Sequence, residues 1–511
     1  MSYFMKDKTK IKILEKMESD YILLRDPIKG KERIEKSLAN LEKDHGKYLE
    51  EWYSFSKENG EVYPSQGLLT TPHDYLNYHS FQMLPQEKVI ETLRLRWFFL
   101  ELFNHPYRIH YLKAAAKSPF SPPPKIHSKT FENASATGLS LSIGDLGASV
   151  VGSSKERTSR TERYAQGPFV KLGKSARMLF VGSASPDVWN SSSAIATMAA
   201  SHCIATVPRN SIMVDVKRQT DLVKEAFSKL NSLKDILLAG RRDKNEVAAL
   251  WNKNIGGVLE ASSQKALPRA LSLFKAGVRL FRIYSPEPGT EVIKTTKLIR
   301  KKFGEGVEIF VGQIIDTDQA KRVEEAGADG VFVGIGGGGR CITGLRSGSV
   351  IDWPSLVWKL RGEISIPVIV EGGASDHIAV SLLLGATGIS TSRVVAGGTI
   401  ESPGGMLFCS DSEGKLFKPY GGEASARTKY LENKVFPFDV PSFVEGETSK
   451  AELSYVKHAL PTLTYNLHLL NEDAILAMVF RNVSSITELH AIDPSPLRRS
   501  TSYDIMQRNT H

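Results

Sequence analysis

From about Met178 onward, the chain alternates short, continuous apolar runs with segments of helical spacing. A continuous apolar run of about four to eight residues is typical of a strand that is covered on both faces. Strands of this kind separated by helices predict a parallel sheet with helices packed over it. The expected strands are Met178–Val181, His202–Val207, Gly256–Leu259, Val278–Ile283, Val307–Val311, Gly330–Val333, Pro367–Val370 and Gly388–Thr391.

Eight such strands in succession predict an α/β fold of the (β/α)8 type, a TIM barrel. Helical patterns such as Ala320–Ala326 and Ile378–Leu384 lie between the strands. Residues Asp235–Leu238 are a further strand candidate before the third unit. An open doubly wound sheet is the alternative, which eight repeats disfavour.

The texture of the sequence divides the chain into four regions. Residues 1–115 combine charged and aromatic residues at helical spacing, which predicts a small, mainly helical N-terminal domain. Residues 116–170 contain the run Pro122–Pro124 and a stretch rich in Ser, Thr and Arg, which predicts a linker and a surface loop. Residues 171–490 are then the barrel, and residues 491–511 are a polar C-terminal tail.

The composition of the 511 residues narrows the class of protein. Hydrophobic content of 41% and charged content of 24% are typical of a soluble globular protein, and no run approaches the roughly 18–20 apolar residues of a membrane span. Three cysteines do not make a disulfide framework, and the N-terminal segment lacks the apolar core of a signal peptide. Both observations predict a reducing, cytoplasmic location. A net charge of +10 suits anionic ligands, but no basic run is interleaved with aromatics, so nucleic acid is not an expected partner. Asp187 and the N-terminal histidines show no metal-ligand spacing.

A glycine-rich loop, Gly334–Gly344, follows the sixth expected strand. In barrels of this type the functional site lies at the carboxyl ends of the strands. The four glycines Gly336–Gly339 cost backbone entropy, so the loop is expected to bring backbone close to a phosphate or a cation. Cys341 follows Arg340, whose charge favours the thiolate, and this predicts a nucleophile. The alternative is that Cys341 is a small buried apolar side chain.

The last two expected strands also end in polar and glycine residues. Glu371–Gly373 follows the seventh strand, and Ser392 and Arg393 follow the eighth. This corner of a barrel commonly holds phosphate, which the amides of a glycine turn and a bidentate arginine can bind. The alternative is that the glycines only make tight turns. Cys203 and Cys409 have no comparable setting and are expected to be structural.

The segment Val333–Thr343 resembles the active-site loop of the inosine-monophosphate dehydrogenase and guanosine-monophosphate reductase family. The resemblance extends from about Met178 to Leu470 and is strongest between Val307 and Ser425, which indicates a divergent member of the family. The other segments that carry it are Val311–Ile315, Ala326–Asp329, Pro367–Gly373, Glu401–Gly404 and Ser410–Gly422.

The resemblance implies oxidoreductase chemistry on a purine nucleoside monophosphate. Cys341 is then the nucleophile that adds to C2 of the purine, and Thr343 is the hydroxyl that helps to activate water or ammonia. Arg427 lies near the place where the dehydrogenases keep a water-activating Arg-Tyr pair. The implied cofactor is NAD, or NADPH for a reductase. Backbone carbonyls of Gly336, Gly338 and Cys341 would bind a monovalent cation, K⁺.

The resemblance also implies the remaining binding residues and a homo-oligomer, a tetramer in the family. Glu371 would take the ribose hydroxyls, and several other groups would surround the phosphate. The substrate-binding residues are Ser183, Gly339, Glu371, Gly372, Gly373, Ser392, Arg393, Tyr420 and Gly422. The cofactor-binding residues are Tyr284, Ser285, Gln313 and Gly334.

This chain departs from the family pattern at several positions. Where this chain has Glu371 and Tyr284, the family usually has Asp, and where this chain has Gly339, the family usually has Ser. Dehydrogenase chemistry is the leading hypothesis because of Cys341 and Thr343, whereas a short flap and a missing inserted domain favour the reductase. Tyr284 motivates a third hypothesis, a non-catalytic nucleotide-binding relative. A flavin-dependent barrel is a fourth alternative. It ranks lowest, because it does not explain the Cys-x-Thr motif.

Overall fold

The computed structural model describes residues 80–84, 86–126, 139–141, 163, 167–183, 185–285, 289–334, 348, 351–372, 378–405, 407–432, 435–436, 440–441, 448–452, 461–493 and 495–499. The chain forms two compact units, each built from three segments. Unit 1 contains Met1–Asn104, Ala184–Ile255 and Ser392–Asn466, and unit 2 contains His105–Ser183, Gly256–Thr391 and Leu467–His511.

Eight strands form one parallel sheet in the order β5-β12-β11-β10-β9-β8-β7-β6. The first of these strands in the chain lies beside the last, and the others follow chain order, which is the order of a (β/α)8 barrel. This confirms the predicted fold class. The strands are β5 (Phe180–Gly182), β6 (Ala205–Val207), β7 (Ile255–Glu260), β8 (Leu280–Tyr284), β9 (Glu308–Ile314), β10 (Gly330–Val333), β11 (Val368–Val370) and β12 (Gly388–Thr391).

The apolar runs form strands because the sheet is covered on both faces. Every residue of β10, β11 and β12 is buried, as expected for strands whose side chains alternate between two covered surfaces. The strand considered at Asp235–Leu238 was wrong, because helix α9 (Val216–Leu237) continues to that point. Leu230, Leu233 and Leu237 recur at helical spacing and extend the buried face of α9.

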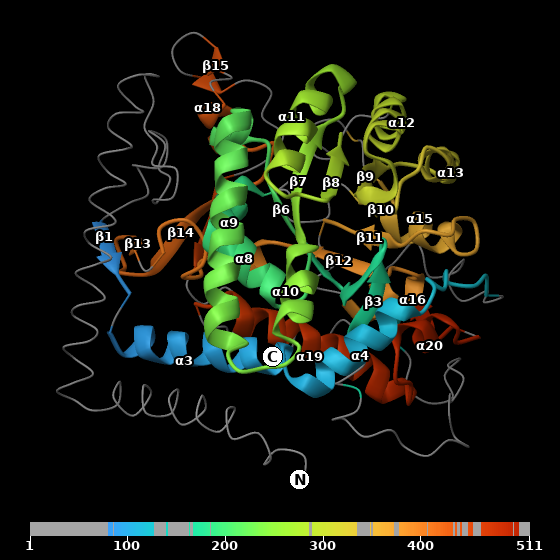
Figure 1. Cartoon of the computed structure of the whole chain (residues 1–511), viewed down its shortest axis with the longest axis horizontal. Coiled ribbons are helices and arrows are strands. Elements are labelled where there is room, and N and C mark those ends of the chain that lie inside the picture. The colour runs from blue at the N-terminus through green and yellow to red at the C-terminus, as the bar shows by residue number, and fades with distance from the viewer. Residues whose placement is uncertain are drawn as a thin grey trace. The chain divides into compact units, whose positions relative to one another are not determined.

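Helices alternate with the strands of unit 2, and Figure 1 shows α11, α12 and α13 flanking β7 to β10. Polar caps start two of them: the Asp316 side chain accepts from the Gln319 amide at α13, and the Asp352 side chain accepts from the Ser355 amide at α15. The helices are α11 (Ser263–Lys275), α12 (Glu291–Phe303), the 3-10 turn η3 (Gly304–Gly306), α13 (Thr317–Glu325), α15 (Trp353–Leu360) and α16 (Ile378–Leu384).

Two antiparallel strand pairs complete unit 2. The hairpin of β3 (Phe169–Leu172) and β4 (Ser175–Met178) contacts α4 (Pro106–Lys117), where Lys171 Nζ donates to the carbonyl of Ala116 at 3.1 Å. Strand β18 (Leu497–Arg499), within the predicted tail, pairs with β2 (Leu139–Leu141), within the predicted linker. Helices α19 (Leu463–Arg481, which begins in unit 1) and α20 (Ile486–His490) precede β18.

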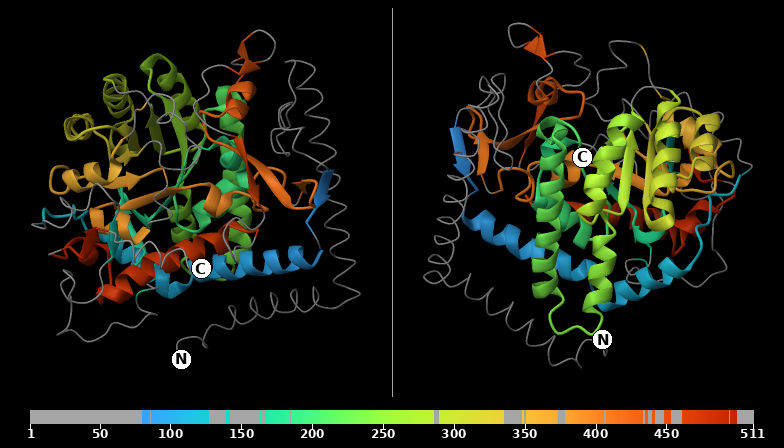
Figure 2. Two further views of the ribbon diagram at one scale, coloured as in Figure 1. Left: turned by 180° about the vertical axis from the view of Figure 1, so that it is seen from behind. Right: turned by 45° about the horizontal axis from the view of Figure 1, so that its top comes forward.

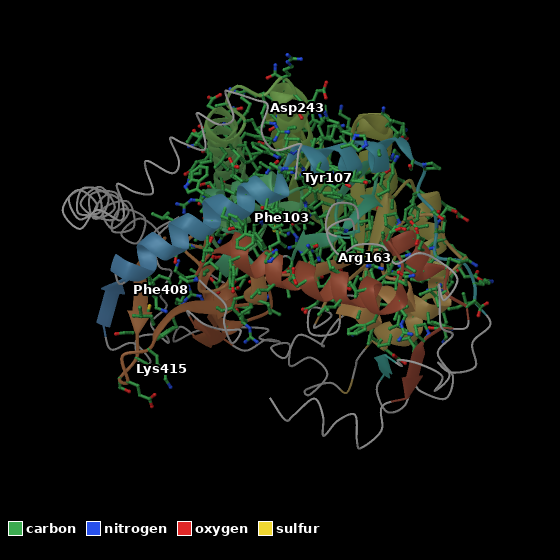
Figure 3. The ribbon with its side chains drawn as sticks, turned by 90° about the horizontal axis from the view of Figure 1, so that it is seen from below. Phe103, Tyr107, Arg163, Asp243, Phe408 and Lys415 are labelled. Carbon is green, nitrogen blue, oxygen red and sulfur yellow. The ribbon has the colours of Figure 1, made fainter. Side chains whose placement is uncertain are left out.

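Unit 1 contains a four-stranded antiparallel sheet in the order β1-β13-β14-β17, and Figure 2 shows β1 beside the orange strands. Leu84, Ile400 and Phe408 form an apolar cluster here, against which Leu93 and Leu416 pack. Figure 3 shows Lys415 at the tip of the β13–β14 hairpin, whereas Phe408 lies nearer to α3. The strands are β1 (Ser80–Met83), β13 (Leu407–Ser410), β14 (Leu416–Gly421) and β17 (Thr448–Glu452), with a small pair β15 (Val435–Phe436) and β16 (Val440–Pro441).

The helices of unit 1 include part of the predicted N-terminal helical domain, at α3. Most of that domain, residues 1–79, lies outside the described residues, so the predicted domain division stays a prediction. No helix among the described residues is both long and apolar enough to span a membrane. The helices are α3 (Gln86–Phe103), α7 (Pro186–Trp189), α8 (Ser192–Ala200), the 3-10 turn η2 (Ser211–Val214), α9, α10 (Lys244–Asn252), α17 (Arg393–Ala396) and α18 (Ala426–Leu431).

Candidate functional site

The backbone at Glu371, one residue past β11, is held closely against the end of β10. Its amide donates to the carbonyl of Val333 at 2.8 Å. The neighbouring Gly334 has a φ of +118°, and a Cβ at that position would overlap the Glu371 carbonyl oxygen. Only glycine combines this left-handed conformation with so close an approach. The first glycine of the predicted loop therefore serves the position of Glu371.

The carboxylate of Glu371 collects donors from three strands of unit 2. Arg282 Nη2 on β8 and Gln313 Nε2 on β9 each donate to Oε2 at 2.6 Å. Ser390 Oγ on β12 donates to Oε1 at 3.1 Å. The Glu371 side chain keeps 15% exposure, while that of Arg282 has none. The predicted ribose-binding carboxylate is thus firmly held and still reachable.

Sequence reasoning missed Arg282, the central residue of β8. Its guanidinium lies 3.9 Å from the ring centre of Phe332 and 5.1 Å from that of Tyr284. A buried charge is costly unless it is paired, and here the Glu371 carboxylate and the aromatic faces compensate it. The signal that would have revealed it is an arginine between the apolar residues Phe281 and Ile283 in the middle of the strand, which demands an acidic partner.

The predicted cofactor residues lie on neighbouring strands. Tyr284 ends β8 and is paired in register with Gly312 of β9. The Ser285 amide donates a hydrogen bond to the Gly312 carbonyl at 2.8 Å, and the Gln313 amide donates one to the Ser285 carbonyl at 2.8 Å. The structure therefore brings Tyr284, Ser285 and Gln313 together at the carboxyl ends of β8 and β9.

Two predicted substrate residues of unit 2 also lie at the ends of strands. The Ser183 amide donates to the Thr391 carbonyl at 3.1 Å, at the ends of β5 and β12. Gly372 follows Glu371 with a φ of +87°, a conformation that favours glycine. Both therefore lie at the carboxyl edge of the sheet that carries Glu371.

The predicted phosphate residues of unit 1 are tied into their own surroundings. The Ser392 hydroxyl accepts a hydrogen bond from Trp189 Nε1 at 2.8 Å. Arg393, the first residue of α17, places its guanidinium 5.9 Å from the ring centre of Tyr420. The Gly422 carbonyl accepts from two hydroxyl groups of the segment that follows it. Ser392, Arg393, Tyr420 and Gly422 thus all belong to unit 1, together with Trp189.

Arg427 on α18 forms a buried ion pair with Asp187 on α7. Arg427 Nε lies 2.8 Å from Asp187 Oδ2, and each side chain is only 1% exposed. Arginine remains protonated in such a pairing, so the Asp187 carboxylate balances the charge of the guanidinium and holds it in place. Sequence reasoning had set Asp187 aside for lack of metal-ligand spacing and had not connected it with Arg427. The predicted part of Arg427 in water activation stays a prediction.

Several predicted residues lie outside the described residues: Cys341, Thr343, Gly336, Gly338, Gly339 and Gly373. The predicted nucleophile and the predicted K⁺ site thus both fall there. Cys203 and Cys409 are buried, in keeping with structural cysteines. Among the described residues, no group of three or more His, Cys, Asp or Glu side chains is placed to hold a metal ion.

Residues 172–468, more than half of the chain, match the model of the IMP dehydrogenase / GMP reductase domain. The chain is 30% identical over 210 residues to inosine-5′-monophosphate dehydrogenase of Cryptosporidium parvum, covering 38% of this chain and 51% of that protein. It is 28% identical over 216 residues to the enzyme of the same name from Aquifex aeolicus, covering 40% and 44%. A third relative, from Nitrosopumilus maritimus, is 34% identical over 165 residues, covering 31% and 34%. The matches thus span about half or less of each relative.

Proposed function

The chain belongs to the IMP dehydrogenase / GMP reductase family, and on this premise we propose that it oxidises inosine monophosphate to xanthosine monophosphate with NAD. In the proposed reaction the Cys341 thiolate adds to C2 of the purine. The C2 hydrogen leaves as hydride, and water then cleaves the resulting thioimidate, releasing the thiol and the product. Bound NAD would supply the acceptor for this hydride. Inosine monophosphate, NAD⁺ and water thus give xanthosine monophosphate, NADH and a proton.

The observation that carries this proposal is the carboxylate of Glu371. It lies at the carboxyl edge of the sheet, where barrels bind their ligands, and it keeps 15% exposure although three donors hold it. A fixed, partly exposed carboxylate is suited to accept hydrogen bonds from ribose hydroxyls. Ser183 and Gly372 lie at the same carboxyl edge of the sheet and would contribute to substrate binding together with Gly373.

The phosphate of the substrate is assigned to the residues that the family resemblance implies for it. Arg393 would provide charge, and Ser392, Tyr420 and Gly422 would line the site with Gly339. Thr343 and Arg427 would assist water activation. Carbonyls of Gly336, Gly338 and Cys341 would hold K⁺.

Residues at the ends of β8 and β9 suit a nicotinamide cofactor. The Gln313 side-chain oxygen is buried and has no hydrogen-bond partner in the described part of the chain. An orphan acceptor of this kind fits a ligand that brings N–H or O–H donors. Tyr284, Ser285, Gln313 and Gly334 would hold NAD, with the Tyr284 ring in place of the more usual acidic side chain.

We further propose that the protein is a cytoplasmic homo-oligomer without nucleic-acid or membrane partners.

The decisive experiment incubates the protein with inosine monophosphate and NAD, following NADH by absorbance and the protein by intact mass. We expect turnover and a nucleotide adduct, both lost in Cys341→Ala. Cys203→Ala, which removes a buried cysteine, is the matched control and should keep both. Absence of turnover and adduct in the wild-type protein would reject the dehydrogenase proposal.

The competing proposal is a GMP reductase, favoured by the short flap after Gly422 in the sequence. In that reaction the cysteine displaces ammonia from guanosine monophosphate, and NADPH supplies the hydride that releases inosine monophosphate. NADPH oxidation with guanosine monophosphate, without NAD-dependent oxidation of inosine monophosphate, would decide for it. Nucleotide binding without either turnover would instead indicate a non-catalytic relative, as the presence of Tyr284 suggests.

A further inference from the structure

In the described part of unit 2, two fully buried arginine side chains each pair with a glutamate, and the two glutamates lie at opposite ends of the barrel strands. Arg177 on β4 pairs with Glu308, the first residue of β9, and Arg282 pairs with Glu371, just after β11. The side chains of Arg177 and Arg282 are both fully buried. Since parallel strands share one direction, Glu308 lies at the amino ends and Glu371 at the carboxyl ends of the sheet. The two pairs can therefore be compared directly.

The Glu308 carboxylate has all its acceptor positions occupied. Arg177 donates to Oε2 at 2.7 Å and to Oε1 at 2.6 Å. Ser175 Oγ adds a bond to Oε1 at 3.3 Å, and the Lys174 amide adds one to Oε2 at 3.0 Å. A carboxylate offers about four acceptor positions, so this pair is closed and serves structure.

Among the described residues, by contrast, donors leave one acceptor position of the Glu371 carboxylate open. Oε2 accepts from both Arg282 and Gln313, and Oε1 accepts from Ser390 Oγ alone. The remaining position is on Oε1, the oxygen that neither Arg282 nor Gln313 holds. The pair of Arg282 and Glu371, at the ligand-binding end of the barrel, thus differs from the closed pair at the other end by one open acceptor position on its glutamate.

Arg282 is held in place by more than its acidic partner. Its guanidinium lies 3.9 Å from the ring centre of Phe332, and its Nε and Nη1 groups are buried without hydrogen-bond partners among the described residues. A guanidinium that sacrifices hydrogen bonds to lie over a ring has its orientation set by the ring, because the planar group favours that stacking. Phe332 therefore orients Arg282, and Arg282 in turn orients Glu371.

From this arrangement we infer that Arg282 is a positioning residue for ribose selectivity: it holds Oε2 of Glu371 so that Oε1 accepts one ribose hydroxyl of the bound nucleotide. This inference rests on the proposed function, because it takes a nucleoside monophosphate as the ligand. Arg282 does not touch the ligand. It acts by restricting the glutamate, whose arm is one methylene longer than that of aspartate and would otherwise have more freedom.

The test measures nucleotide affinity by titration calorimetry on the full chain, with inosine monophosphate and its 2′-deoxy and 3′-deoxy analogues. A hydrogen bond to a charged group corresponds to roughly tenfold in affinity or more. We expect the wild-type protein to bind inosine monophosphate at least about tenfold more tightly than one of the analogues. Arg282→Met should lose this ratio while its affinity for that analogue changes little.

Two further variants separate positioning from general damage. Arg177→Met removes the closed pair and should lower the thermal midpoint while keeping the affinity ratio. Arg282→Lys keeps a cation near Oε2 but loses the planar stack on Phe332, so an intermediate ratio is expected, and it replaces Arg282→Met if that variant does not fold. An unchanged ratio in the Arg282 variants, or an equal loss in Arg177→Met, would overturn the inference.

The outcomes for the wild-type protein distinguish a failure of the proposed function from a failure of the inference about Arg282. If it binds none of the three nucleotides, the proposed function fails and the inference falls with it. If it binds inosine monophosphate without discriminating against either analogue, the inference alone is refuted. A ratio that is lost in Arg282→Met, reduced in Arg282→Lys and kept in Arg177→Met supports both.

Discussion

The buried pair of Arg427 and Asp187 allows a sharp test of a residue that the sequence placed in catalysis. With both side chains 1% exposed and 2.8 Å between Nε and Oδ2, replacing Arg427 by Met leaves a carboxylate buried without its cation. Breaking a buried pair in this way costs about 3–5 kcal/mol. For a domain of roughly 150–250 residues, about 2 °C is lost per kcal/mol at the least, so we expect the thermal midpoint to fall by about 6–10 °C.

A double-mutant cycle shows whether the loss belongs to the pair. In Asp187→Asn with Arg427→Met the buried charge is gone, so the double variant should be more stable than the sum of the single losses implies, by about 1–3 kcal/mol. Differential scanning calorimetry on the full chain measures all three variants. Arg218→Met is the control, because Arg218 pairs with Asp215 at 3.9 Å with half of the aspartate exposed, and about 1 kcal/mol or less is expected.

Two results would refute this reasoning. If Arg427→Met melts as close to the wild-type protein as the Arg218 control does, the pair does not stabilise unit 1. If it keeps its midpoint and loses only turnover, Arg427 acts in catalysis, as the sequence pattern predicted.

Four other variants test the backbone at the site, the pH dependence and a buried lysine. Gly334→Ala should cost more than about 3 kcal/mol in urea unfolding, since backbone strain is added to overlap with Glu371. Gly304→Ala, with a φ of +58° but open space, should cost less, about 1–3 kcal/mol. Burial, with the charge of Arg361 second, lowers the pKa of His490 to about 3, from 6.5. The unfolded chain therefore takes up the proton first, and stability should fall as the pH drops from 6.5 toward 3, by up to about 1.4 kcal/mol per pH unit. His490→Gln should flatten that profile in pH-dependent melting, and an unchanged slope would contradict this assignment. Lys418→Met leaves three backbone carbonyls, which accept from Nζ at 2.6–3.2 Å, without that donor. We expect the free energy of unfolding in urea to fall by at least about 2 kcal/mol, and an unchanged value would argue against this.

The barrel could be predicted because its signal is local. Strands β10 and β12 begin and end at the predicted residues, since a strand covered on both faces must be apolar wherever its neighbours come from. The error at Asp235–Leu238 has the same origin. A short apolar run at the end of a helix looks like a strand until the spacing of Leu230, Leu233 and Leu237 is followed along the whole of α9.

The site could be predicted only in part. Position after the seventh strand was enough to select Glu371, because the carboxyl ends of parallel strands carry function. Its donors were not foreseen: Ser390 lies 19 residues away, Gln313 58 and Arg282 89. Nothing in a local pattern states which of several polar residues will meet across a sheet.

The amino-acid sequence by itself thus determined the order of strands and helices and the edge at which polar side chains gather, because hydrophobic periodicity depends on near neighbours. Only the tertiary structure decided how the buried charges are paired: Arg282 with Glu371, and Arg427 with Asp187, 240 residues apart. The physical reason is that a buried ion must find its counterion in space. The same apolar strands that make the barrel recognisable leave the partner of a lone arginine unspecified until the sheet closes.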